Sequence, residues 1–252
     1  MEDNNFRGNS DQIILIDKPV GISSFGVVAK VRWKLTEEKW CEMQKIQPNI
    51  SRKQARVKVG HCGTLDPFAT GLLILVSGKF TRRAGDFAKL DKVYLADIQL
   101  GATSTTGDPE GEIRENSVQK IPSQNDIVKL IREKFTGEIT QTPPIYSAIK
   151  IDGERAYKLA RKVKKSSDES SREDLAAKIP PRKVIIYAIE ILSYDWPLLT
   201  IRAHVSSGTY IRSLAADIGR ELGTGAYCAE LRREKIGKYN VKNAARLPDC
   251  NY

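Results

Sequence analysis

The sequence predicts an α+β fold with a mainly antiparallel sheet. Segments of strand and helix character are mixed along the chain without the regular strand–helix alternation of parallel-sheet proteins. Two strand-like segments, Lys183 to Ser193 and Leu198 to Ser206, are joined by a short turn, which favours an antiparallel pair. The 252 residues are 40% hydrophobic, enough to bury a core, and they show no repeat or strong interior boundary. We therefore expect a single domain over residues 1–252.

Apolar periodicity and turn residues predict the elements in order. Alternating or continuous apolar runs predict strands at 13–16, 72–76, 92–101, 183–193 and 198–206. Helical spacing predicts helices after the capping residue Ser23 or Ser24 and at 126–135, 154–162, 211–222 and 226–233. Residues 101–111 are typical of a polar loop. Two polar segments are expected to be insertions: the basic residues 37–58, as a loop or poorly ordered helix, and residues 162–179, as a mobile excursion.

The charge of the chain indicates a polyanionic partner. The formal net charge is +10, and the excess is clustered. Lys30 to Lys58 holds nine basic against three acidic residues, and Arg232 to Arg246 holds six against one. Such patches attract nucleic acid and give salt-sensitive binding. Acidic membrane lipid is the competing partner, but no basic amphipathic helix with an aromatic face is evident.

Several function classes find no support in the sequence. No apolar stretch reaches the roughly 18 residues needed to cross a bilayer, and the N-terminus lacks a secretory pattern. The four cysteines are scattered, which argues against a zinc site or a disulfide framework and for the reducing cytoplasm. The chain has two histidines, which gives a serine–histidine triad little support. It contains no nucleotide-binding fingerprint, so the sequence does not indicate a nucleotide cofactor. What remains is carboxylate chemistry on a polyanion, with no metal and no cofactor.

The segment Gly60 to Gly71 is the strongest candidate for a reactive site. Three glycines and a proline force a tight, irregular backbone, which carries the carboxylate of Asp66 and the imidazole of His61. The apolar run Leu72 to Val76 follows at once and anchors the loop in the core. A stiff, anchored loop can place a reactive group accurately. An ordinary surface turn, where Asp-Pro is common, is the alternative.

Three other constellations stand out. Tyr210 and Arg212 follow a strand and start a helix, and Arg212 could grip a carboxylate with two hydrogen bonds or simply lie on the surface near a helix cap. Tyr94 lies in an alternating strand, where filling the core is the ordinary role of a tyrosine. Gln141 to Lys150 contains two prolines before an aromatic residue, which makes a rigid ledge.

These motifs together resemble the TruB family of RNA pseudouridine synthases, the tRNA pseudouridine-55 synthases. The match runs from Asp17 to about Pro248. The blocks, in order, are Lys18-Pro19-x-Gly21-x-Ser23-Ser24; Gly60-His61-x-Gly63-Thr64-Leu65-Asp66-Pro67-x-Ala69-Thr70-Gly71; Lys92-x-Tyr94 with Leu100-Gly101 through Asp108 and Gly111; Phe135-x-Gly137 with Gln141-x-Pro143-Pro144-x-Tyr146-Ser147-Ala148-x-Lys150; and Gly208-Thr209-Tyr210-Ile211-Arg212-Ser213 to Leu231-Arg232-Arg233.

The resemblance implies a fold, a reaction and a set of roles. It implies a pseudouridine-synthase-like catalytic domain that isomerises uridine 55 in the T-arm of tRNA. Asp66 would attack the ribose or the base, Tyr94 would stack on the target base and assist proton movement, and Arg212 would pair with Asp66. The expected substrate-pocket residues are His61, Tyr210 and Leu231. The residues expected to support the loop or contact RNA are Lys18, Lys150, Arg232 and Arg233. We expect a cytoplasmic monomer.

The chain departs from the family at three places. Ser104 stands where the family usually has threonine, the two insertions are longer than the core requires, and we expect no C-terminal RNA-binding PUA domain. We hypothesise that the first insertion compensates for that domain. Three alternatives stay open: an RNA-binding module or tRNA-folding chaperone with vestigial catalysis, the same activity on messenger stem-loops shaped like a T-arm, and a carboxylate hydrolase of N-glycosides.

Overall fold

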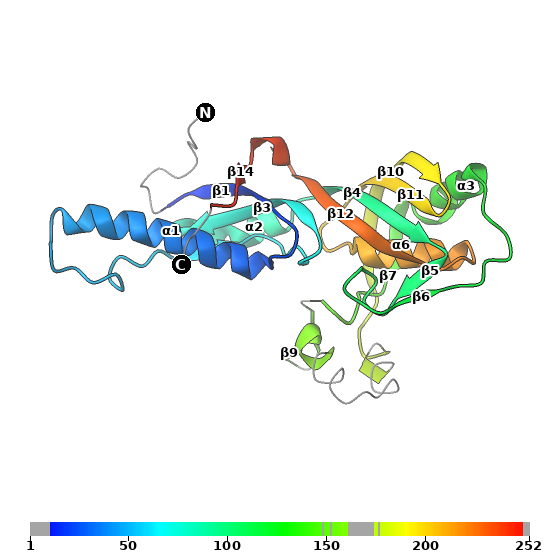
Figure 1. Ribbon diagram of the computed structural model, residues 1–252, viewed down its shortest axis with the longest axis horizontal. Helices are drawn as coiled ribbons and strands as arrows, with labels where there is room; N and C mark the ends of the chain where they lie inside the picture. The colour runs from blue at the N-terminus through cyan, green and yellow to red at the C-terminus, as the bar shows by residue number, and fades with distance from the viewer. Residues whose placement is uncertain (1–10, 148, 152, 161–173, 176, 249–252) are drawn as a thin grey trace. The chain divides into compact units, whose positions relative to one another are not determined.

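The computed structural model describes residues 11–147, 149–151, 153–160, 174–175 and 177–248, which Figure 1 shows in colour. The chain divides into two units. Residues 1–93 and 232–252 form the first unit, and residues 94–231 form the second. The strand β4 (Lys92–Leu100) begins in the first unit and continues in the second. The strand β12 (Ala226–Ile236) begins in the second unit and ends in the first. A single domain over the whole chain stays a prediction.

The first unit is built on the antiparallel pair β1 (Ile13–Lys18) and β3 (Thr70–Ser77). The short strand β2 (Val59–His61) also pairs with β3, antiparallel. The end of β12 runs parallel to β3, with Arg232 opposite Thr70 and Arg233 opposite Gly71. The short strand β14 (Ala245–Arg246) is parallel to β1, β13 (Tyr239–Asn240) pairs with β12, and the 3-10 helix η2 (Val241–Asn243) lies between β13 and β14.

Period-two alternation in β3 sends side chains to two hydrophobic layers. Leu73 and Leu75 pack with the helix α1 (Ser24–Gln44), whose Val27, Val28, Val31 and Leu35 are buried at helical spacing. Leu72, Ile74 and Val76 pack with Phe87 from the opposite layer. That layer holds the 3-10 helix η1 (Gly78–Arg83) and the short helix α2 (Ala84–Ala88).

Of the two options predicted for residues 37–58, a loop or a poorly ordered helix, the structure has a helix in the first part. The helix α1 continues to Gln44, and the chain then returns beside it (Figure 1). The Trp40 indole donates to the carbonyl of Ile50 at 2.9 Å, and the Val57 amide donates to the Thr36 hydroxyl at 3.2 Å. Ile50, Ala55 and Val57 are buried. These contacts stabilise a helical turn whose weak amphipathic pattern gives little signal. Ser23 caps the helix, as predicted, by accepting from the Gly26 amide at 3.0 Å.

The second unit contains a sheet in the order β12-β4-β11-β10-β7. The strands β10 (Arg182–Asp195) and β11 (Leu198–Val205) form the predicted antiparallel pair, and β7 (Gly137–Gln141) pairs antiparallel with β10. The helix α3 (Gln124–Lys134) starts with a capping box at Ser123. The helix α6 (Ile211–Glu221) buries Ile211, Leu214, Ala215 and Ile218 at helical spacing. The mainly antiparallel α+β fold is confirmed.

Three local predictions need correction. Residues 226–233 belong to the strand β12 rather than to a helix, because backbone pairing with β3 and β4 overrides the good helix formers in this segment. The loop 101–111 contains the strand β5 (Ala102–Ser104), which pairs with β6 (Ile113–Glu115). The hairpin of β8 (Lys150–Ile151) and β9 (Glu154–Arg155) replaces the start of the helix expected at 154–162, and residues 156–160 are helical.

The expected excursion 162–179 lies mostly outside the described residues, which omit 161–173 and 176. Among the helices that are described, none combines the length and the apolar character needed to span a bilayer.

Candidate active site

Asp66 lies on the connection between β2 and β3 in the first unit. Its side chain is half-buried, between the buried Leu65 and Ala69. The other potential nucleophile of this loop, the Cys62 thiol, is buried, and burial raises its pKa to about 11 despite the opposing charge of Arg233. At neutral pH Cys62 is therefore a protonated thiol, which is a poor nucleophile.

Two buried cations hold the backbone on both sides of Asp66. The Lys18 ammonium donates to the carbonyl of Pro67 at 3.2 Å and also to those of Pro19 and Ile22, both at 2.8 Å. The Arg233 guanidinium donates to Gly63 at 3.2 Å, Thr64 at 3.3 Å and Leu72 at 2.7 Å. Lys18 is fully buried and Arg233 is 1% exposed. The predicted loop-supporting role of both residues therefore has a geometric basis in the loop carbonyls.

The start of α1 adds a further anchor to the loop. The buried Ser24 hydroxyl lies 2.8 Å from both the amide and the carbonyl of Leu65. The Ser24 hydroxyl therefore donates to the carbonyl and accepts from the amide of Leu65, the residue immediately before Asp66. Arg232, also expected near the loop or RNA, binds Asp17 through both guanidinium nitrogens at 2.7 and 3.1 Å and lies 3.4 Å from the Thr70 hydroxyl. The side chain of Arg232 thus ties β12 to β1 beside the loop.

Gly71 is required where β3 meets β12. A Cβ atom there would lie 2.4 Å from the Arg233 carbonyl oxygen and 2.7 Å from its amide nitrogen, and φ is +101°. We expect Gly71→Ala to lower the free energy of unfolding by about 2 kcal/mol or more, because backbone atoms of β12 must move away. Urea denaturation measures the change. Gly60→Ala is the matched control, since a Cβ at Gly60 meets nothing within 4 Å. Equal losses in the two variants contradict the prediction.

Lys92, at the start of β4, carries a perturbed ammonium in the first unit. It is 5% exposed and donates to the carbonyl of Ala88 at 2.6 Å and to that of Leu90. Burial, aided by the nearby charge of Arg233, lowers the pKa of Lys92 from 10.5 to about 8.

This shift predicts a pH-dependent stability. Between pH 8 and the ordinary pKa, the unfolded lysine keeps its proton while the folded one has lost it, so raising the pH favours the folded state. Relative to Lys92→Met, the free energy of unfolding of the wild-type protein should rise by up to about 1.4 kcal/mol per pH unit above pH 8. Urea denaturation from pH 7.5 to 9.5 checks this slope; a constant difference between the two proteins argues against it.

In the second unit, Arg212 forms a buried ion pair with a residue to which the sequence analysis gave no role. Its guanidinium lies 3.0 Å from the Asp108 carboxylate, and the two side chains are 3% and 4% exposed. It also donates to the carbonyls of Thr106 and Tyr146, both at 2.8 Å. Asp108 in turn accepts from the Glu110 amide at 3.0 Å and from the Thr106 hydroxyl. Arg212 is therefore held in one orientation.

Tyr210 precedes α6 and is held by Gln141 and Arg182. The fully buried Gln141 amide bonds both the amide and the carbonyl of Tyr210, at 2.8 and 2.9 Å. The Arg182 guanidinium lies over the Tyr210 ring at 4.7 Å from its centre and donates to the carbonyl of Gly208. Gln141 belongs to one of the motif blocks that resemble the family. No local sequence pattern, however, indicates its hydrogen bonds with Tyr210, which is 69 positions away.

The remaining predicted site residues fall in both units. Tyr94 lies on β4 of the second unit and is 8% exposed, as is Leu231 on β12. His61 ends β2 in the first unit and is half-buried. Lys150 starts β8, and its side chain lies outside the description. Asp66 belongs to the first unit, whereas Tyr94 and Arg212 belong to the second, so their meeting at one site stays a prediction. Within the described ranges, no group of three or more potential metal ligands occurs.

Comparisons with known proteins agree with the motifs. The profile described as TruB family pseudouridylate synthase (N terminal domain) matches residues 50–211. The chain is 41% identical to tRNA pseudouridine synthase B of Endomicrobium trichonymphae over 244 residues, which is 96% of this chain and 92% of that protein. It is 40% identical to tRNA pseudouridine synthase B of Dehalococcoides mccartyi over 239 residues, 95% of this chain and 69% of that protein.

A solved structure shares the fold. A Cbf5–Nop10–Gar1 complex matches with a TM-score of 0.60 and 28% identity, over 95% of this chain and 53% of the matched one. The present chain thus spans about half the length of that structural relative. Because the family profile covers most of the chain and relatives near 40% identity cover almost all of it, the protein belongs to the TruB family of pseudouridylate synthases.

Proposed function

We propose that the protein isomerises uridine to pseudouridine in tRNA and that its target is uridine 55 of the T-arm. Family membership carries the proposal: the 41% identity to a tRNA pseudouridine synthase B extends over 96% of the chain. The loop around Asp66 supports it, because buried Lys18 and Arg233 fix the backbone on either side of the one carboxylate between Gly60 and Gly71.

The reaction suits a site with a single carboxylate. The N1–C1′ bond breaks, the uracil turns, and a C5–C1′ bond forms; C5 loses a proton and N1 gains one. No group is lost and nothing is oxidised, so the stoichiometry needs neither ATP nor a redox partner. The carboxylate of Asp66 is the reactive group in each of three routes: attack on C1′, attack on the base, or promotion of elimination from the ribose.

The other roles follow from what the target base needs. It leaves its stack at a cost of a few kcal/mol and needs an aromatic platform, which Tyr94 supplies. Arg212 pairs with Asp66 in the substrate-bound enzyme and favours its ionised form, because an opposite charge offsets burial. The remaining pocket residues are His61, Tyr210 and Leu231, and Lys150 and Arg232 contact RNA. We propose further that the protein acts as a monomer in the cytoplasm.

The test uses unmodified tRNA labelled with tritium at C5 of uracil. We expect the purified protein to release label into water up to about one equivalent per tRNA, with pseudouridine mapping to position 55. Release of free uracil would instead identify a hydrolase. Binding without label release would identify an RNA-binding module, and label release from T-arm-like messenger stem-loops but not from tRNA would assign a different substrate.

A further inference from the structure

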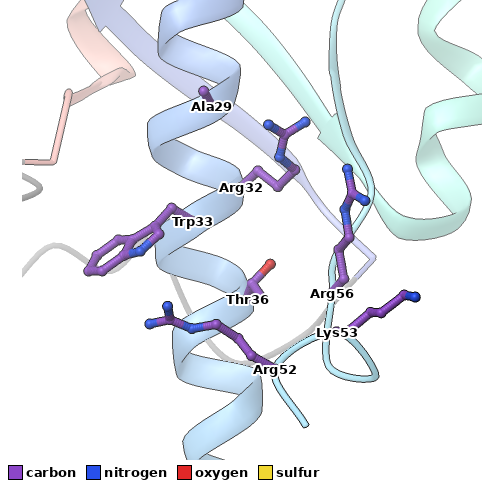
Figure 2. Close-up of a pocket in the computed structure, with 7 residues that line it drawn as sticks. All are labelled: Ala29, Arg32, Trp33, Thr36, Arg52, Lys53 and Arg56. Atoms are coloured by element: carbon purple, nitrogen blue, oxygen red, sulfur yellow. The ribbon is translucent and has the colours of Figure 1, made fainter. Parts of the chain in front are cut away.

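A basic groove lies along the middle of α1. It is about 490 Å³ in volume and is lined by α1 and by the chain that returns beside it (Figure 2). The lining residues are Ala29, Arg32, Trp33, Thr36, Arg52, Lys53 and Arg56. Four of these side chains are cationic, one is an indole, and none is acidic. We call this surface the α1 groove.

The α1 groove is a built feature and not merely a solvated run of charge. The returning segment is clamped to α1 by the Trp40–Ile50 and Val57–Thr36 hydrogen bonds, at 2.9 and 3.2 Å. Ala55, between Lys53 and Arg56, is fully buried. The backbone that carries Lys53 and Arg56 is therefore fixed relative to α1, so little ordering entropy is lost when a ligand binds.

The charges of the α1 groove are only partly compensated within the protein. Arg52 pairs with Glu37 and lies 5.9 Å from the centre of the Trp33 ring. Arg32, Lys53 and Arg56 form no ion pair with any residue that the structure describes. Figure 2 shows Arg32 projecting from α1 and Lys53 and Arg56 from the segment beside it. Three cations facing one hollow favour an anionic ligand with several charges.

The indole of Trp33 favours nucleic acid among the possible anionic ligands of the α1 groove. Trp33 is half-buried and lines the same groove, with Arg52 beside its ring and the other three cations on the other side of α1 (Figure 2), so the α1 groove offers a π surface together with charge. Nucleic acid presents both complementary parts, because phosphates bind Arg and Lys while bases stack on aromatic rings. We propose that the α1 groove is a second RNA-binding site, which holds phosphates and a stacked base of the substrate RNA outside the target nucleotide. This inference rests on the proposed function, which supplies the RNA.

The position of the α1 groove within the first unit supports a contact beyond the target base. Ser24, at the start of α1, bonds Leu65 next to Asp66. Trp33 lies nine residues further along the same helix, about 14 Å at 1.5 Å per residue. Stacked nucleotides are about 3.4 Å apart along one strand, so this separation corresponds to roughly four of them. RNA with its target base at the loop therefore reaches the α1 groove with other nucleotides.

The test compares tRNA binding by two triple variants of equal charge change. In the first, Arg32, Lys53 and Arg56 are replaced by alanine; in the control, the exposed Arg82, Lys89 and Lys129 are replaced by alanine. We expect the groove variant to bind tRNA roughly tenfold or more weakly and to lower the slope of log affinity against log salt by about 2 to 3. The control should stay within about twofold of the wild-type protein.

Substitutions of Trp33 provide an independent test of the second RNA-binding site. Trp33→Ala should weaken binding roughly 5- to 100-fold through lost stacking, whereas Trp33→Phe should keep most of the affinity. Circular dichroism and thermal unfolding verify that each variant is folded. If the triple variant is unstable, the single exchange Lys53→Glu, at an exposed position, replaces it in the binding comparison. In the tritium assay, KM should rise in the groove variants while kcat at saturating tRNA is unchanged.

The outcomes separate the two proposals. If the wild-type protein releases label but the groove variants bind tRNA like the control, the second site is refuted and the proposed function stands. If the wild-type protein releases no label, the proposed function fails, and the binding comparison still decides the groove. Unchanged tRNA binding together with lost binding to phosphatidylglycerol vesicles reassigns the α1 groove to anionic lipid and overturns the inference.

Discussion

Asp66→Asn is expected to lower tritium release from labelled tRNA by about 10⁴-fold or more, because an amide cannot act as the carboxylate nucleophile or base. Binding of tRNA and the stability of the fold should change little. The contacts of Lys18, Ser24 and Arg233 with this loop are made to backbone atoms, so they do not depend on the side chain at position 66. The exchange also preserves the size of that side chain.

A matched exchange elsewhere in the first unit controls for loss of a surface charge. Asp86→Asn removes an exposed carboxylate on α2 that pairs with Arg83, and we expect it to leave the rate within about twofold. Label release by Asp66→Asn at more than a tenth of the wild-type rate would show that another group carries the reaction.

Asp108→Asn is expected to lower the free energy of unfolding by about 3 kcal/mol, because it leaves the Arg212 guanidinium charge buried without its carboxylate. The loss should lie at the lower end of the usual range, since the carbonyls of Thr106 and Tyr146 still accept from the guanidinium. Tritium release should fall with it, because the orientation of Arg212 relaxes. Urea denaturation at neutral pH measures the stability change.

Two further variants sharpen this result. Replacing both partners, in Asp108→Asn with Arg212→Met, should cost less than the sum of the single exchanges, because no uncompensated charge remains. The exposed pair of Arg202 and Glu190 is the comparison, and Glu190→Gln should cost less than about 1 kcal/mol. If Asp108→Asn costs no more than Glu190→Gln, the buried pair does not stabilise the second unit.

Local pattern predicted the regular elements well and failed where distant parts of the chain decide the structure. The strands β1, β3, β4, β10 and β11 and the helices α3 and α6 follow from periodicity and capping. The strand β12 was mistaken for a helix because Leu, Arg, Glu and Lys favour helices, whereas pairing with β3 and β4 selects the strand. The length of α1 depends on contacts with residues 50–57, which no local pattern reveals.

The candidate site shows the same division. Asp66 was found because a rigid loop and a family motif mark it in the sequence. The partnership of Arg212 with Asp108 was missed because the two residues are 104 positions apart and either one, seen alone, reads as a surface charge. The burial of Lys18 and Arg233 was not predicted for the same reason, since long cationic side chains are seldom buried.

The anchoring of the Asp66 loop by Lys18 and Arg233 has a consequence for how the chain folds during its synthesis. These two residues are 215 positions apart in the chain, yet both grip the same short segment. A ribosome must therefore translate at least as far as Arg233 before that segment can acquire all of these contacts. Until then the segment that carries Asp66 lacks one of its two buried cationic anchors, so its full set of contacts forms only after synthesis of Arg233.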